Sequence, residues 1–125
     1  ILKRFCRVEN CKFSMLNERI INVLPSSPEH ALSHILKQSI SYFHVNGTLE
    51  DSINRIAKIT PLYFYFFSMS GRNNTHYDRR VNLTLRNRKV VDLLNEIAIQ
   101  TNTCWGIVPI NREGTEYLVD FRICP

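Results

Sequence analysis

Two histidines, His30 and His34, lie four residues apart in a stretch whose other residues predict a helix. This spacing places both imidazoles on one helix face, where a pair of histidines can bind zinc. Ala31 stands where a zinc protease carries its catalytic glutamate, and no third ligand is evident in the sequence. We therefore favour a solvated helix face, and we expect neither a metal nor another cofactor.

Nucleophilic catalysis needs a serine or cysteine on a tight turn flanked by glycine. Residues 68–71, Ser-Met-Ser-Gly, come nearest to this pattern but do not form it. The four glycines are too scattered for a phosphate-binding loop. The acids Asp51, Asp92 and Glu96 are explained by positions at helix starts or on an exposed helix face. We find no catalytic constellation and predict that the protein is not an enzyme.

The four cysteines, Cys6, Cys11, Cys104 and Cys124, lack the spacing of a zinc site. Cys104 and Cys124 end two predicted strands of one hairpin, so they could face each other across it. Two interpretations stay open: buried free thiols, or a disulfide formed in an oxidising compartment.

A basic cluster surrounds one predicted strand and the start of the next helix; it consists of Arg79, Arg80, Arg86, Arg88 and Lys89. With Tyr63 and Tyr65 nearby, this cluster could form a platform for RNA. The two tyrosines lie in the most apolar predicted strand, which favours a role in the core. Nucleic-acid binding is therefore kept as an alternative.

Length and composition are those of one globular domain: 125 residues, 44% hydrophobic and 22% charged, with a net charge of +5. No run approaches the roughly 20 apolar residues that cross a bilayer. The start, Leu2-Lys3-Arg4-Phe5, does not resemble a signal peptide. We expect either a cytosolic chain or one that is processed or truncated.

A duplicated segment organises the chain. Residues 51–60, DSINRIAKIT, recur as residues 92–101, DLLNEIAIQT, and the identical positions are Asp51/Asp92, Asn54/Asn95, Ile56/Ile97, Ala57/Ala98 and Thr60/Thr101. Both copies have the apolar spacing of an amphipathic helix. Each copy follows an alternating run and precedes an apolar one, which predicts strand–helix–strand used twice in one compact domain.

The elements that flank the repeats follow from local signals. Ser27 and Pro28 predict the start of a helix, whereas residues 1–24 predict a partly helical arm, because Phe13, Leu16, Ile20 and Leu24 have helical spacing. Alternation predicts a strand over residues 41–46 that ends in a turn at Asn46-Gly47.

Thr48 and Asp51 predict a capping box for the first repeated helix, which Pro61 ends. Further predicted elements are a strand covered on both faces (62–67), a polar loop (68–78), a strand (79–86) with Val81, Leu83 and Leu85 inward, a helix capped by Asn87 and ending near residue 102, and a hairpin of strands 104–110 and 117–123. In the last strand, Tyr117, Val119, Phe121 and Ile123 share one face. Pro109 places the preceding strand at a sheet edge or bulge.

The stretch from Ser41 to Ile123 resembles a secretin N-terminal domain, and within that group it is similar to the DotD/TraH family of lipoproteins from type IVB secretion and conjugation systems. The residues that carry the likeness are 45–51 (VNGTLED), 55–58 (RIAK), 64–66 (FYF), 81–85 (VNLTL) and 117–122 (YLVDFR). The resemblance implies an α+β fold with two helices between a two-stranded and a three-stranded sheet. We expect residues 1–40 to form an arm and a helix, and residues 41–125 to form this domain.

The resemblance also implies a non-enzymatic role. Family members are periplasmic proteins, anchored to the outer membrane by a lipid, that help to assemble the secretion complex beside DotC- and DotH-like partners. Neither Cys6 nor Cys11 follows the small residues of a lipobox, so an anchor would require a native start upstream.

We expect partner contacts, and possible self-association, through an unfinished sheet edge and the arm. The candidate residues are Phe13, Leu16, Ile20, Leu24, Trp105, Ile107 and Pro109. The alternatives are a basic nucleic-acid-binding module of ferredoxin-like topology, and the secretin N-terminal domain of a longer secretin or signalling receptor.

Overall fold

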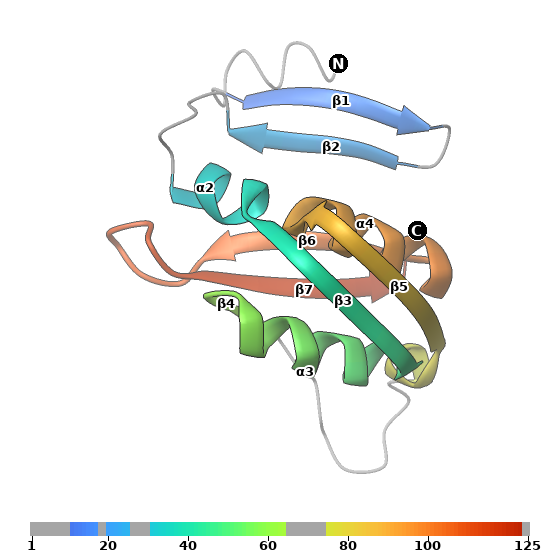
Figure 1. Cartoon of the computed structure of the whole chain (residues 1–125). Coiled ribbons are helices and arrows are strands. Elements are labelled where there is room, and N and C mark those ends of the chain that lie inside the picture. Colours follow the sequence, from blue (N-terminus) through green and yellow to red (C-terminus); the bar gives the residue numbers. More distant parts are fainter. Residues whose placement is uncertain (1–10, 18–19, 26–30, 65–74, 124–125) are drawn as a thin grey trace.

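The computed structural model describes residues 11–17, 20–25, 31–64 and 75–123, and the side chains of its first two strands are outside this description. The elements in order are β1 (Cys11–Asn17), β2 (Ile20–Pro25), α2 (Ala31–Lys37), β3 (Ser39–Thr48), α3 (Leu49–Ile59), β4 (Leu62–Phe64), the 3₁₀ turn η1 (Thr75–Asp78), β5 (Arg80–Lys89), α4 (Val90–Thr101), β6 (Thr103–Pro109) and β7 (Tyr117–Ile123) (Figure 1). The predicted α+β class is confirmed.

The strands after α2 form two separate sheets. β3 pairs with β5 antiparallel, and the second sheet has the order β4-β7-β6, in which β4 runs parallel and β6 antiparallel to β7. Helices α3 and α4 each contact strands of both sheets. In Figure 1, β3 and β5 cross in front of β6 and β7. A ferredoxin-like fold would join these strands in one sheet, so that topology is not the one observed.

One hydrophobic core unites both helices and both sheets. Its fully buried side chains come from every layer, for example Phe43, Ile53, Leu94 and Phe121. Leu36 of α2 belongs to the same core, so the expected boundary at residue 40 does not separate two cores. The described helices include none long and apolar enough to span a bilayer.

The duplicated segment corresponds to a symmetric pair of strand–helix units. A residue of the first unit matches the one 41 positions later, as Asp51 matches Asp92. In every register pair of β3 and β5, the two residue numbers add up to 128, so exchanging the two units leaves the pairing unchanged. The bond from Leu49 N to the Arg79 carbonyl (2.9 Å) therefore has a counterpart from Val90 N to the Gln38 carbonyl (3.0 Å). The two units are related by an approximate two-fold axis through the β3–β5 sheet.

Matching residues of the repeat make equivalent hydrogen bonds. Asp51 accepts a hydrogen bond from the backbone N–H of Thr48 (2.9 Å), and Asp92 accepts one from Lys89 (3.2 Å), so both carboxylates cap helix starts. Thr48 also accepts from Asp51 N, which confirms the predicted capping box. At the other end, the hydroxyls of Thr60 and Thr101 donate to carbonyls one turn earlier, at 2.9 and 2.8 Å.

The prediction of a partly helical arm is wrong for the described part of residues 11–25. These residues form β1 and β2, an antiparallel pair in which Phe13 lies opposite Val23. Apolar residues at 13, 15, 16, 20, 21, 23 and 24 fit a strand as well as a helix, because the segment is apolar at both spacings. The backbone pairing of residues 11–17 with residues 20–25 stabilises the strand conformation.

Two predicted boundaries are also wrong. Asn46 and Gly47 do not form a turn; they continue β3 opposite Asn82 and Val81, and the chain passes directly into α3. Asn87 does not cap α4, which begins at Val90 with Lys89 as its N-cap. Asn87 instead lies within β5 with a left-handed backbone, φ 53°.

The remaining strands agree with the sequence in part. Val81 and Leu83 are buried and Leu85 is partly buried, whereas Asn82, Thr84 and Arg86 are exposed, as alternation predicts. Tyr63, however, is 51% exposed and Ile123 is 55% exposed, so the described part of the 62–67 strand is not covered on both faces, and the last strand ends in solvent. The 68–71 segment, the Ser27–Pro28 cap, His30 and Tyr65 lie outside the described residues.

Candidate functional site

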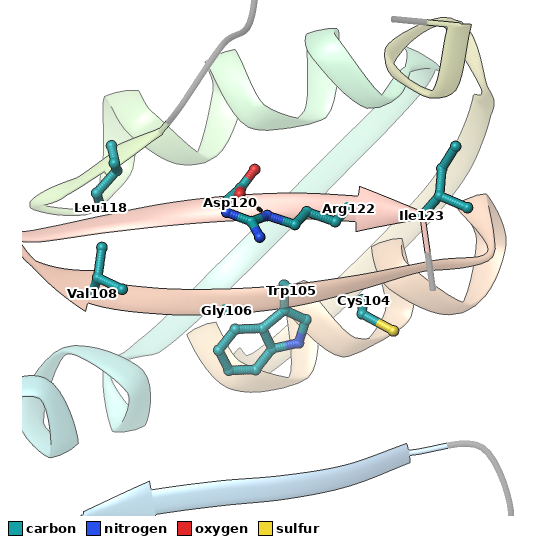
Figure 2. Close-up of a pocket in the computed structure, with 8 residues that line it drawn as sticks. All are labelled: Cys104, Trp105, Gly106, Val108, Leu118, Asp120, Arg122 and Ile123. Carbon is teal, nitrogen blue, oxygen red and sulfur yellow. Dashed lines mark hydrogen bonds and ion pairs between the residues drawn. The ribbon is translucent and has the colours of Figure 1, made fainter. Parts of the chain in front are cut away.

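The outer face of the three-stranded sheet is an open groove of about 610 Å³. Alternation along β6 and β7 turns Tyr117, Val119 and Phe121 into the core and leaves the even-numbered residues on the other face. The lining residues are Cys104, Trp105, Gly106, Val108, Leu118, Asp120, Arg122 and Ile123 (Figure 2). We call this surface the outer groove.

An apolar row crosses all three strands at one end of the outer groove. Leu118 of β7 is paired with Tyr63 of β4 on one side and with Val108 of β6 on the other. Tyr63 is 51% exposed and Val108 is 54% exposed. A contiguous exposed apolar row on a sheet face is typical of surfaces that bind another protein.

The middle of the outer groove is hollow because Gly106 has no side chain there. A Cβ atom at Gly106 would meet no atom within 4 Å. Asp120, opposite Gly106, pairs with Arg122, whose side chain is 81% exposed (Figure 2). An ion pair with so exposed a partner contributes little to stability.

Beside the outer groove, β6 is the edge strand of its sheet. Ile110 N donates to the Glu116 carbonyl at 3.0 Å, so these two residues form a hydrogen-bonded pair. Their numbers have the same sum as those of every register pair of β6 and β7, so the pairing runs along both strands without a shift. Because backbone bonding alternates along an antiparallel pair, the even residues of β6 bond to β7. The backbone N–H and C=O groups of Trp105 and Ile107 therefore point to the edge, where the described residues supply no further strand. Pro109 brings no N–H to this edge.

The predicted contact residues of β6 are Trp105, Ile107 and Pro109, and they expose different groups. The Trp105 and Ile107 side chains are partly buried against the core, and the Trp105 indole donates to Asn95 of α4 at 3.0 Å. Both side chains therefore pack against the core, although Trp105 also borders the outer groove, and both residues present backbone to the edge. Pro109 is exposed at the end of β6. The proposed contacts of Phe13, Leu16, Ile20 and Leu24 concern side chains outside the described part and stay predictions.

Sequence reasoning did not predict the apolar row: it passed over Val108 and Leu118, and it placed Tyr63 in the core or in an RNA platform. The signal was present, because residues 104–108 and 118–122 alternate within a predicted hairpin, and the faces not assigned to the core must be exposed. Placing Tyr63 beside Leu118 required the parallel pairing of β4 with β7, which no local pattern indicates.

Cys104 is disulfide-bonded. Cys124 lies outside the described residues, so the predicted pairing of these two cysteines stays a prediction. In the register of the hairpin, Cys104 lies opposite Arg122, two residues before Cys124.

The basic cluster seen in the sequence is not one surface. Arg79 donates to the carbonyls of Thr101 (2.6 Å) and Asn102 (3.2 Å), where its charge stabilises the end of α4. Arg88 pairs with Asp92 at 3.5 Å. Tyr63 belongs to the three-stranded sheet, across the helices from β5, so the platform of these arginines with Tyr63, kept as an alternative, is not assembled.

The histidines that the structure describes belong to three different elements, α2, β3 and η1. His34 is exposed on α2, His44 shares a 2.8 Å hydrogen bond with Thr84, and His76 bonds to the carbonyl of Phe121 at 3.1 Å. Within the described ranges, no group of three His, Cys, Asp or Glu side chains is placed to hold a metal ion.

No protein-family model, curated protein or solved structure matches the chain.

Proposed function

We propose that the protein is a structural component of a bacterial type IVB secretion or conjugation complex, related to the DotD/TraH lipoproteins, and that it acts by binding other proteins. The observation that carries this proposal is the arrangement of α3 and α4 between a two-stranded and a three-stranded sheet. This is the arrangement that a secretin N-terminal domain would have. In this proposal the protein works at the periplasmic side of the outer membrane, held there by a lipid on a longer native N-terminus.

The docking mechanism in this proposal is strand addition at β6. A partner strand would bond to the backbone of Trp105 and Ile107, as extended segments do at open sheet edges. Its side chains on the outer side would meet Val108 and the apolar row beyond it. Edge bonding supplies affinity, and the outer groove supplies specificity. The partners would be DotC- and DotH-like proteins of the same complex, or a second copy of the chain.

Fractionation of the producing cells and crosslinking test the proposal together. A photo-crosslinking residue at Val108 should capture outer-membrane proteins of a secretion complex, and the protein should sediment with the outer membrane. The same residue at Lys58, which is exposed on α3, is the matched control. Recovery in the cytosol, or equal capture from both positions, would reject the proposal.

A substitution at the edge separates strand addition from other modes of docking. Val108→Lys places a charge on the outer side of the edge strand, a feature that discourages strand addition in natural sheets. With the crosslinking residue moved to Leu118, the register partner of Val108, we expect Val108→Lys to abolish capture. Val108→Thr should retain it, since threonine keeps the β-branched shape. Thermal unfolding of both variants should match the parent, because Val108 is 54% exposed.

A further inference from the structure

The outer face of the β3–β5 sheet is polar and basic, and the register defines it. Tyr42 lies opposite Arg86, His44 opposite Thr84, and both ends of the ladder carry a cation, Arg80 and Lys89. These six side chains are all exposed. We call them the basic face. The left-handed backbone of Asn87 interrupts the alternation of β5, which leaves both Arg86 and Lys89 in solvent.

Within the described ranges, no ion pair neutralises Arg80, Arg86 or Lys89. Neither β3 nor β5 contains an aspartate or a glutamate. The carboxylates of Asp51 and Asp92 contact the ends of these strands, but both cap helices: Asp51 bonds to Thr48 N, and Asp92 bonds to Lys89 N and pairs with Arg88. The Arg80 side chain donates to Asn46 at 3.3 Å, a neutral partner that orients the guanidinium without cancelling its charge. Such a surface attracts polyanions.

Planar groups are stacked along the centre of this face. The Arg86 guanidinium lies 4.9 Å from the centroid of the Tyr42 ring, and the rings of Tyr42 and His44 are 6.5 Å apart and inclined by only 19°. Aromatic rings and guanidinium groups both stack on nucleic-acid bases, and sheets that bind single strands use such platforms. The exposed amides of Asn46 and Asn82 add hydrogen-bonding groups beside the stack.

We infer that the basic face binds single-stranded nucleic acid, with phosphates against Arg80, Arg86 and Lys89 and bases stacked on Tyr42 and His44. An anionic membrane would make little use of a face whose only exposed large apolar side chain is Tyr42. An acidic peptide would use the cations but has no bases to stack on the rings. The strands are ten residues long, about 33 Å, which suits a site of several nucleotides.

This activity is independent of the proposed docking through β6. The basic face and the outer groove belong to different sheets, with α3 and α4 between them (Figure 1). Variants on one sheet therefore leave the other unchanged, and the two proposals can fail separately.

The test is fluorescence anisotropy of a labelled oligodeoxythymidine of about 12 nucleotides, within the size range of single-strand sites, titrated with the 125-residue chain at several salt concentrations. Replacing Arg80 and Arg86 by glutamine should lower the slope of log affinity against log salt by about 0.7 for each arginine. Arg55→Gln on α3 removes the same charge from another exposed position and should leave the slope unchanged.

Tyrosine variants separate stacking from charge. Tyr42→Ala should weaken binding roughly tenfold, and Tyr42→Phe should retain parental affinity, since the ring supplies the stacking surface. Thermal unfolding confirms that each variant is folded. The inference is overturned by absence of oligonucleotide binding at low salt, by equal affinities of Tyr42→Ala and Tyr42→Phe, or by equal binding of polyglutamate or of phosphatidylserine vesicles.

Discussion

The indole N–H of Trp105 donates a hydrogen bond to the side-chain carbonyl of Asn95 at 3.0 Å, and this bond joins the edge strand β6 to helix α4. Asn95 is 4% exposed, so water cannot replace the indole easily. In the first repeated helix the matching residue, Asn54, is exposed. The bond therefore distinguishes the second unit and fixes the strand that we propose as a docking edge.

Trp105→Phe should destabilise the protein by about 1–3 kcal/mol, because it removes the donor and leaves a buried amide with one bond fewer. A double-mutant cycle with Asn95→Ala in urea should give a coupling energy of about 0.5–1.5 kcal/mol. Additivity of the two single substitutions would show that the bond does not contribute to folding.

The two threonines that close the repeated helices should differ in their importance. Thr101 is 1% exposed, and its hydroxyl bonds to the Ile97 carbonyl and to the Thr103 hydroxyl, both at 2.8 Å. Thr101→Val leaves the buried Thr103 hydroxyl without this partner and should cost about 1–3 kcal/mol. Thr60→Val at the matching, partly exposed position should cost less than about 1 kcal/mol. Chemical denaturation measures both values, and equal losses would contradict this account.

Two glycines in strands, Gly47 and Gly106, should differ in how they tolerate alanine. A Cβ atom at Gly47 would lie 2.2 Å from a carboxylate oxygen of Asp51, which caps α3. Gly47→Ala must displace that carboxylate and should cost about 1–2 kcal/mol, the loss of a helix cap. Gly106→Ala has open space and should change stability by less than about 0.5 kcal/mol. Calorimetry measures the stability of both variants. An unchanged stability of Gly47→Ala would contradict the predicted clash.

Gln100 covers part of the β5 edge of the two-stranded sheet. Its side-chain amide accepts from Asn82 N and donates to Asn82 O, each at 2.9 Å, and so takes the place of a neighbouring strand. Gln100→Ala should cost about 1 kcal/mol and increase self-association, since it uncovers backbone groups on β5. Gln100→Glu keeps only the acceptor and should fall between the parent and the alanine variant. Light scattering at rising concentration measures the association; no increase in the alanine variant would contradict the protective role.

Local signals predicted the parts of the fold that local interactions decide. The capping box at Thr48 and Asp51, the alternation of β5 and the β6–β7 hairpin each depend on residues close together in the chain. The duplicated segment predicted two equivalent helices, and matched side chains at Asp51/Asp92 and Thr60/Thr101 have equivalent bonds.

The errors lie where distant contacts outweigh local preference. Asn46-Gly47 has the composition of a hairpin turn, yet pairing with β5 extends the strand through it, and glycine is required there by the approach of Asp51. Tyr63 was expected in the core because its strand is apolar throughout. The helices cover only one side of its sheet, which leaves Tyr63 exposed beside Leu118 at the end of the outer groove. The basic face likewise depends on which strands pair, since Tyr42 and Arg86 are distant in sequence.

The shared register of β3 and β5 has a consequence for how such a chain can arise. Each strand–helix unit contacts the other through the same residues that it would use to contact an identical copy of itself. One unit therefore carries all the backbone groups needed to pair with a second. A short ancestral peptide with one strand and one helix could have assembled as a homodimer across the same axis. Fusion of two such peptides, followed by divergence of the contacts around positions such as Asn54 and Asn95, would then yield a single chain with two unlike halves.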